Sequence, residues 1–250
     1  MQYGICHLSI VPLRFESSDK SELVSQLLYG DHFKIIEKRK NWSRIRLAFD
    51  SYEGWIDNKQ YQEIDENQYV QLQNSDLKLS IDLVEFIEDS HEQLHPILLG
   101  STLNGLSVLN HKHDGSIVEG RKSKSNIIQT AFLYLNSPYL WGGKSPFGID
   151  CSGFTQMVYK LCGYKLLRDA SQQATQGEVL SFIEESEPGD LAFFDNEEGN
   201  IIHVGIIMND YNIIHAHGKV RIDTLDHSGI YNVDTKMHTH KLRIIKRLIQ

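Results

Sequence analysis

Residues 139–159 restrict the possible folds of this chain more than any other stretch. In them a glycine-rich loop is followed by one cysteine, and this cysteine begins a segment in which apolar residues recur at regular spacing. Within that segment Phe154, Val158 and Leu161 recur at helical spacing. The spacing predicts a helix with one buried face over about 152–162. A cysteine in the first turn of a helix is well placed to serve as a thiol nucleophile.

Cys151 is the cysteine at this position. In the first helical turn, unpaired backbone N–H groups and the positive end of the helix dipole favour thiolate over thiol, and the same N–H groups can hold an oxyanion. The alternative is a small buried core cysteine, which is the commoner fate of a lone cysteine. The polar neighbours Asp150 and Ser152 do not suit an apolar core, so we prefer the nucleophile.

The chain has twelve histidines, and a cysteine nucleophile needs one of them as its base. His111 and His113 superficially resemble a metal-binding pair, but no further ligands lie near them in the sequence. Nine histidines lie in polar or mixed sequence without a partner pattern, so we expect solvated surface positions for His7, His32, His91, His95, His111, His113, His227, His238 and His240.

Residues 200–217 are the exception among the histidine-containing segments, because two β-branched runs flank an Asn-Asp pair and predict a hairpin. A three-residue loop at 208–210 would place His203 and His215 directly opposite each other, with Cβ atoms roughly 5 Å apart. His217 would then be a diagonal neighbour on the same face. The sequence does not determine the loop length, so this register is a hypothesis.

Six motifs, in this order and spacing, resemble the NlpC-type cysteine peptidases of bacterial cell walls. The resemblance covers about the second half of the chain. It implies that Cys151 is the nucleophile, His203 the general base and His215 the polar residue that orients this base. The motifs are Tyr139-Leu-Trp-Gly-Gly, Gly148-Ile-Asp-Cys-Ser-Gly-Phe, Arg168-Asp-Ala-Ser, Pro188-Gly-Asp-Leu, His203-Val-Gly-Ile and Ile214-His-Ala.

The composition excludes several classes of protein. A net charge of -8 gives no electrostatic attraction to phosphate, so nucleic acid and membranes are not expected partners. Three cysteines, an odd number, do not make a disulfide framework.

The N-terminus lacks the features of a secretory signal, so we expect a cytoplasmic protein, or a periplasmic one if a signal has been removed. No metal or cofactor is expected, and the sequence gives no indication of an oligomeric state.

Residues 1–65 read as short strands separated by polar turns, which is typical of a small β-barrel. The segment resembles a bacterial SH3-like domain, which in some NlpC-type peptidases abuts the catalytic site and helps to bind the free amine of the substrate. The resemblance assigns this role to Asp31 and Tyr52. The alternatives are a turn residue for Asp31 and a surface aromatic for Tyr52.

The rest of the chain divides into two further regions. Residues 66–120 are interpreted as a second, divergent SH3-like domain, with a helical spacer as the alternative. Residues 121–250 form the expected catalytic domain, with helices packed on one side of an antiparallel sheet. The expected fold is therefore α+β, with a papain-like NlpC catalytic domain preceded by one or two small SH3-like β-barrels.

Further site residues are expected around the nucleophile. Tyr139 is expected to offer its hydroxyl to the oxyanion, and Trp141 to form either an aromatic wall or part of the core. Asp169 is expected either to cap a helix or, by the resemblance, to bind polar groups of the substrate. Asp150 and Ser152, which flank the nucleophile, are also predicted to bind substrate.

The resemblance implies cleavage of the bond between γ-D-glutamate and the diamino acid of peptidoglycan stem peptides. An abutting SH3-like domain with these residues further implies a requirement for a free N-terminal L-Ala, and hence recycling of peptides of the type L-Ala-γ-D-Glu-diamino acid. Three alternatives stay open. They are a hydrolase of intact peptidoglycan with wall-binding SH3-like modules, a Cys–His amidase or acyltransferase, and a non-catalytic binding protein.

Overall fold

The computed structural model describes residues 1–249, which form two compact units. The first unit holds residues 1–120 and 141–146, and the second holds residues 121–140 and the chain from Phe147 onward. Within the described part of the chain, no helix has both the length and the apolar character that crossing a membrane requires.

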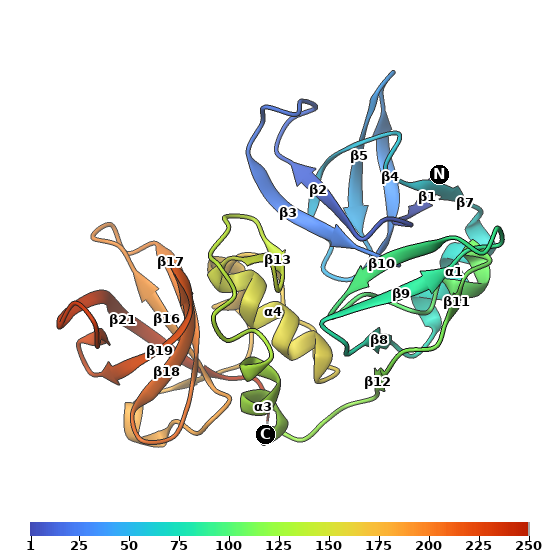
Figure 1. Ribbon diagram of the computed structural model, residues 1–250. Helices are drawn as coiled ribbons and strands as arrows, with labels where there is room; N and C mark the ends of the chain where they lie inside the picture. Colours follow the sequence, from blue (N-terminus) through green and yellow to red (C-terminus); the bar gives the residue numbers. More distant parts are fainter. Residues whose placement is uncertain (250) are drawn as a thin grey trace. The chain divides into compact units, whose positions relative to one another are not determined.

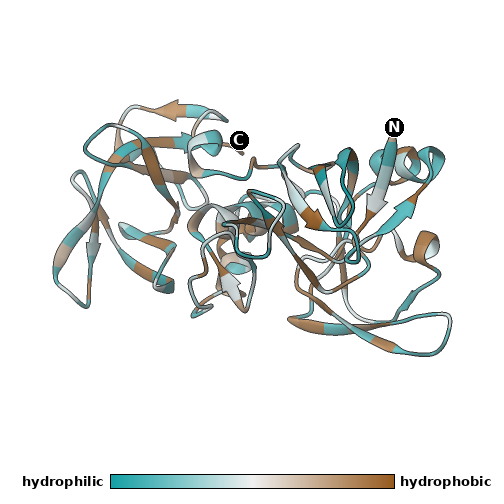
Figure 2. Cartoon of the chain, turned by 90° about the horizontal axis from the view of Figure 1, so that it is seen from above, coloured by the Kyte–Doolittle hydropathy of each residue, from teal (hydrophilic) through white to brown (hydrophobic). Residues whose placement is uncertain are grey.

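Seven strands form the main sheet of the first unit, in the order β3-β2-β6-β5-β4-β1-β7 (Figure 1). Buried residues alternate with more exposed ones along β2 and β5, and Figure 2 colours the chain by hydropathy. In β5, Ile45 and Leu47 enter the core, whereas Arg44 and Arg46 face outward and pair with Glu53. The strands are β1 (Gln2–Ile5), β2 (Ile10–Arg14), β3 (Leu23–Leu28), β4 (His32–Lys38), β5 (Trp42–Leu47), β6 (Glu53–Asp57) and β7 (Gln62–Ile64).

Residues 66–120 share a hydrophobic core with this sheet. Tyr3 and Tyr29, from the first 65 residues, lie in one buried cluster with Ile87 and Ile97. The second, divergent SH3-like domain over 66–120 stays a prediction. The elements here are α1 (Glu66–Asn74), β8 (Lys78–Ser80), β9 (Val84–Glu88), β10 (Leu94–Leu98), α2 (Leu106–Leu109), β11 (Lys112–His113) and β12 (Ile117–Glu119), and β13 (Lys144–Ser145) also belongs to the first unit.

A second sheet of seven antiparallel strands forms the frame of the second unit, in the order β15-β21-β16-β17-β18-β19-β20, and an additional pairing joins β20 to β21. The helix α4 packs against β17 and β18 of this sheet and contacts α3 and α5 (Figure 1). The expected α+β class is confirmed. The elements are α3 (Asn126–Phe132), β14 (Gly148–Ile149), α4 (Cys151–Leu161), α5 (Ala170–Gln173), β15 (Glu178–Leu180), the 3-10 helix η1 (Ile183–Glu185), β16 (Leu191–Asp195), β17 (Ile201–Ile207), β18 (Asn212–His217), β19 (Lys219–Asp226), β20 (Gly229–Asn232) and β21 (Met237–Arg247).

The helix α4 is present where the apolar spacing predicts it, but it begins one residue earlier, at Cys151. Asp150 is its N-cap and accepts a hydrogen bond of 2.7 Å from the backbone N–H of Gly153. Gly163, with φ +82, follows its last turn and donates its backbone N–H to the carbonyl of Lys160. Every residue of α4 is buried, so the helix is a core element and not a half-exposed one.

The predicted register of the β17–β18 hairpin is wrong by two residues. Gly205, and not His203, lies opposite His215. The loop consists of 209–211 instead of 208–210, because Asp210 and Tyr211 adopt positive φ and Met208 still pairs with the strand that follows. A shift of two residues keeps side chains on the same face of a strand, so His203 and His215 remain neighbours, now on the diagonal.

Candidate active site

Cys151 occupies the first position of α4, where the helix N-terminus meets β17. Its side chain is buried, and the backbone N–H groups of Val204 and Ser152 lower the pKa of its thiol. Val204 directly follows His203 in β17, so the strand that supplies the expected base also contacts the expected nucleophile. Asp150 occupies the backbone N–H of Gly153, two residues after Cys151.

The surroundings of Cys151 oppose the predicted preference for the thiolate form. Burial, together with the neighbouring carboxylate of Asp150, raises the pKa of the Cys151 thiol to about 12, although Arg168 and the two backbone N–H groups lower it. Burial also holds the pKa of His203 well below its ordinary value, with nearby histidines adding to the effect. Both shifts favour a neutral thiol and a neutral imidazole before attack.

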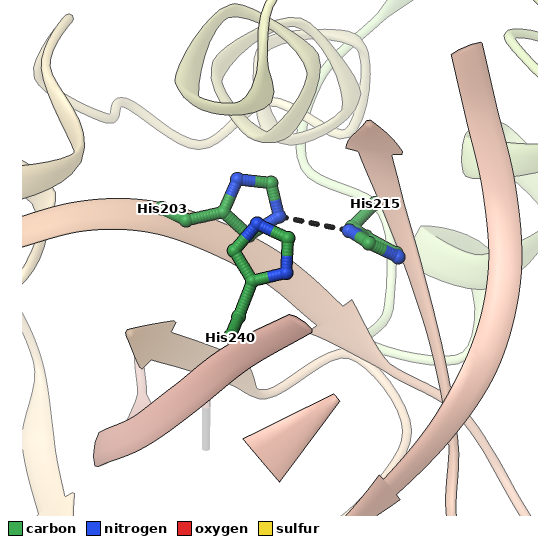
Figure 3. Close-up of side chains that lie close together, drawn as sticks. All are labelled: His203, His215 and His240. Carbon is green, nitrogen blue, oxygen red and sulfur yellow. Dashed lines mark hydrogen bonds between the residues drawn. The ribbon is translucent and has the colours of Figure 1, made fainter. Parts of the chain in front are cut away.

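Three side chains form a buried hydrogen-bonded chain across β17, β18 and β19. Nε2 of His203 lies 2.8 Å from Nδ1 of His215, as Figure 3 shows, and Nε2 of His215 lies 3.0 Å from Oδ2 of Asp223. Asp223 also receives two hydrogen bonds from Arg221, at 2.7 and 2.9 Å. Burial raises the pKa of Asp223, but the hydrogen bonds with His215 and Arg221 outweigh it and lower this pKa to about 2, so Asp223 remains a carboxylate.

The carboxylate determines the tautomers of both histidines. Since Asp223 can only accept, His215 donates from Nε2 and presents a lone pair at Nδ1. His203 then donates from Nε2 to that lone pair, which leaves the lone pair of His203 on Nδ1. In Figure 3 this second nitrogen of His203 points away from His215. An oriented imidazole with a free lone pair is what a general base for a thiol requires.

Asp223 is the site residue that the sequence interpretation missed. A tight turn at Gly218 lets β19 pair with β18. Asp223 then lies opposite Ile213, which is two residues before His215 and on the same face of β18. The sequence interpretation stopped at residue 217, but the alternating run of residues 219–226 is a strand signal that places Asp223 two residues after Arg221.

Several histidines that we expected on the surface are partly buried. His240 of β21 stacks on His203, with ring centroids 4.1 Å apart and an interplanar angle of 23°. His111 accepts or donates a 2.9 Å hydrogen bond with the hydroxyl of Tyr29, and both ring nitrogens of His113 are buried. Intermediate burial also applies to His7, His32 and His95, whereas His91, His227 and His238 are exposed as predicted.

Asp150 and Ser152 form a buried ion-pair network with Arg168. The guanidinium of Arg168, 1% exposed, contacts both carboxylate oxygens of Asp150 at 3.0 and 2.7 Å and the hydroxyl of Ser152 at 2.9 Å. This network fixes the start of α4 and therefore the position of Cys151. A role of Asp150 and Ser152 in binding substrate stays a prediction.

Tyr139 is half-buried, and its backbone forms a parallel bridge with Ile149, two residues before the nucleophile. Burial, with the neighbouring Cys151 and Asp150, raises the pKa of Tyr139 to about 12, so its hydroxyl keeps its proton and can donate a hydrogen bond. Asp169 lies at the N-cap of α5, and its backbone N–H donates to Gln172. Its substrate role stays a prediction.

The remaining candidates lie in the first unit. Trp141 is 60% exposed and donates from its indole nitrogen to Glu22 at 2.7 Å, so the core-packing alternative is wrong. Asp31 is buried in the turn after Gly30 and accepts the backbone N–H of Leu28 at 2.9 Å. Tyr52 is partly buried and packs against the core of the first sheet. The roles of Trp141, Asp31 and Tyr52 toward substrate stay predictions.

Comparison with known families assigns both parts of the chain. Residues 136–240 match the NlpC/P60 family, a range that includes Cys151, His203, His215 and Asp223. The chain carries an NlpC/P60 domain. Residues 13–60 match the bacterial dipeptidyl-peptidase Sh3 domain. The expected NlpC-type cysteine peptidase with an N-terminal SH3-like domain is confirmed.

Two curated relatives that carry the same name are similar to this chain. The γ-D-glutamyl-L-lysine dipeptidyl-peptidase of Bacillus cereus is 27% identical over 229 residues, which cover 80% of this chain and 68% of the relative. The protein of the same name from Bacillus subtilis is 37% identical over 118 residues, covering 46% of this chain and 40% of the relative. The crystal structure of an NlpC/P60 family protein from Bacillus cereus matches with a TM-score of 0.82 and 19% identity, over 99% of this chain and all of that one, and so shares the fold.

Proposed function

We propose that the NlpC/P60 domain of this chain hydrolyses the γ-D-glutamyl–diamino acid bond of peptidoglycan stem peptides. The observation that carries the proposal is the buried chain from Asp223 through His215 to His203, beside the nucleophile position at the start of α4. Two relatives that are named γ-D-glutamyl-L-lysine dipeptidyl-peptidases support the choice of bond.

Acylation begins from the neutral pair. Nδ1 of His203 takes the proton of Cys151 as the sulfur attacks the carbonyl of the γ-glutamyl bond, and the imidazolium that forms is stabilised through His215 by the carboxylate of Asp223. We infer that the backbone N–H groups at the start of α4 and the protonated hydroxyl of Tyr139 donate hydrogen bonds to the oxyanion. Protonated His203 then donates to the leaving amine.

Deacylation reverses the proton movements. Water takes the place of the departed amine, His203 accepts its proton, and the hydroxide attacks the thioester carbonyl. Collapse of the second tetrahedral intermediate expels the Cys151 sulfur, which regains its proton from His203. No other group of the chain has to change its protonation state.

We also propose that Asp31 and Tyr52 recognise the free amine of an N-terminal L-Ala. Both residues fall within the range that matches the dipeptidyl-peptidase Sh3 domain. A carboxylate forms a charge-assisted hydrogen bond with an ammonium group, and an aromatic ring adds a favourable cation–π contact. Such recognition would restrict the substrates to released stem peptides, which fits a recycling role and a cytoplasmic location.

The test is mass spectrometry of the products from L-Ala-γ-D-Glu-L-Lys and from its diaminopimelate counterpart. Release of L-Ala-D-Glu is expected from the wild type, and Cys151→Ala should abolish it, lowering kcat by about 10⁴-fold or more. Cys162→Ala, which removes a buried thiol from the other end of the same helix, is the matched control and should retain activity. Absence of L-Ala-D-Glu with the wild type would refute the proposal.

The amine requirement is tested with the N-acetylated substrate and Asp31→Asn. Loss of one charge-assisted hydrogen bond should lower kcat/KM on the free peptide by roughly 10–100-fold. On the N-acetylated peptide the wild type and Asp31→Asn should be equally slow, and the exposed Asp19→Asn should behave as wild type on both. Equal cleavage of free and acetylated peptide by the wild type would contradict the role of Asp31.

Recovery of the protein in the soluble cytoplasmic fraction of its host tests the proposed location.

A further inference from the structure

Four histidines gather on the face of the second sheet that carries the site. His203, His215, His217 and His240 come from β17, β18 and β21, and their ring centroids lie between 4.1 and 6.5 Å apart. For three of them, His203, His215 and His240, one ligand-capable nitrogen of each ring lies within 4.8 Å of the other two. The proposed hydrolysis uses only two of these rings, so the position of His240 calls for another explanation.

The backbone aims His240 into this cluster. In the β20–β21 ladder Ile230 pairs with His240 and Tyr231 with His238, so Thr239 is the extra residue of a β-bulge. The hydroxyl of Thr239 lies 2.8 Å from Nδ1 of His240 and 3.5 Å from the carbonyl of Ile230. When the hydroxyl donates to that carbonyl, it accepts from Nδ1–H of His240, which leaves the lone pair of His240 on Nε2.

Figure 3 shows the ring of His240 lying over that of His203, with His215 beside them. His215 is already oriented as a metal ligand would be, because its Nε2–H donates to the buried carboxylate of Asp223 while Nδ1 faces the cluster. A carboxylate behind a ligating histidine is the usual outer-shell arrangement of metal sites. His240 is only partly buried, so the cluster has a route of entry from solvent.

Three imidazoles select a particular class of ion. Neutral imidazole nitrogen suits Zn²⁺ and its transition-metal neighbours, whereas Ca²⁺ and Mg²⁺ prefer oxygen ligands. Two imidazole nitrogens on one tetrahedral Zn²⁺ lie roughly 3.3 Å apart. Nε2 of His203 and Nδ1 of His215 are 2.8 Å apart because a hydrogen bond joins them. For an ion to take the place of the shared proton, these two nitrogens must move apart slightly. The ring of His240 must also rotate so that its nitrogen reaches the ion.

We propose that His203, His215 and His240 bind a Zn²⁺-class dication that reversibly inhibits the peptidase. Coordination through Nε2 of His203 moves the ring proton to Nδ1, so the nitrogen that accepts the proton of Cys151 becomes a donor. No proton leaves the protein in this tautomeric change, and no bond to substrate is involved. The inhibition rests on the proposed function, whereas the binding of the ion does not.

Binding is tested without any activity measurement. Isothermal titration of the metal-free full chain with ZnCl₂ should show one ion per chain, CoCl₂ should give the visible absorption of tetrahedral Co²⁺, and CaCl₂ and MgCl₂ should give no heat. His240→Phe keeps a ring on His203 but removes the ligand, and should weaken Zn²⁺ binding by about 100-fold or more, exceeding the 10–100-fold typical of an outer-shell change. His227→Ala, at an exposed histidine, should bind as the wild type does.

The nucleophile is not among the proposed ligands, so Cys151→Ala should bind Zn²⁺ as the wild type does. Failure of the wild type to bind, unchanged binding by His240→Phe, or loss of binding in Cys151→Ala would each overturn the site. Inhibition is then measured for each active variant against its own metal-free rate. Zn²⁺ should inhibit the wild type and a chelator should restore the rate, while His240→Phe should resist the same Zn²⁺ concentration. Binding without inhibition would overturn the regulatory role alone.

Discussion

Nε2 of His215 lies 3.0 Å from Oδ2 of Asp223, and both side chains are completely buried. The carboxylate fixes the tautomer of His215 and, through it, that of His203. The direction of the hydrogen bonds in the site therefore originates at a residue that need not touch the substrate. Asp223 is a positioning residue, and its role can be separated from that of the nucleophile.

Asp223→Asn should lower kcat by about 10²–10⁴-fold with little change in KM. An amide that donates to Nε2 of His215 would place the proton of that ring on Nδ1, where it opposes the Nε2–H of His203. Steady-state kinetics with L-Ala-γ-D-Glu-L-Lys as the substrate measures the effect. Asp234→Asn is the control, because Asp234 also pairs with Arg221 but is 72% exposed, and it should keep the wild-type kcat. An unchanged kcat for Asp223→Asn would contradict the tautomer argument.

Arg168→Met should destabilise the second unit by about 3–5 kcal/mol, because it leaves the buried carboxylate of Asp150 without its cation. Urea unfolding followed by fluorescence measures the change. Arg44→Met, which breaks an ion pair whose arginine is 47% exposed, should cost less than about 1 kcal/mol. Equal losses from the two substitutions would show that the Asp150–Arg168 pair does not hold the start of α4.

Gly142→Ala should destabilise the first unit by more than the roughly 1–3 kcal/mol that a strained backbone conformation costs alone. Gly142 has φ +76, and a Cβ added there would lie 2.3 Å from the carbonyl oxygen of Leu23. Gly120, with φ +71 and open space around it, provides the matched control. Thermal unfolding should show a smaller loss for Gly120→Ala, and the reverse order would contradict the steric argument.

Protonation of His111 should contribute to acid destabilisation of the first unit. Burial and the neighbouring His95 and His7 lower the pKa of His111, against the opposing charge of Asp89. In the unfolded chain His111 takes up a proton near pH 6.5, whereas in the folded chain it does so only at lower pH. The free energy of unfolding therefore falls as the pH drops below 6.5, and it stops falling below the pKa of His111 in the folded chain.

His111→Asn tests this dependence, since the amide oxygen can replace Nδ1 as the partner of the Tyr29 hydroxyl. Chemical unfolding at a series of pH values should give a shallower loss of stability below pH 6.5 for His111→Asn than for the wild type. His91→Asn, at an exposed position, should retain the wild-type slope. Identical slopes for His111→Asn and the wild type would exclude His111 as the titrating group.

Local signals in the sequence were sufficient to predict the class of fold and to single out Cys151 and His203 as candidates. The apolar spacing after Cys151, the β-branched runs around His203 and His215 and the short strands of the first 65 residues each report an element through its own period of 3.6 or 2. Hydrophobic periodicity depends only on which residues face the core. It therefore predicts an element without knowledge of the elements that pack against it.

The tertiary structure decided what periodicity cannot encode. Two positive-φ residues in the loop moved the β17–β18 register by two, a bulge at Thr239 turned His240 onto His203, and Asp223 joined the site from a third strand. Burial raises the pKa of Cys151, because removal of water outweighs the N–H groups at the start of α4. Register, bulges and desolvation arise from contacts between distant segments, so they become visible only when the strands are assembled.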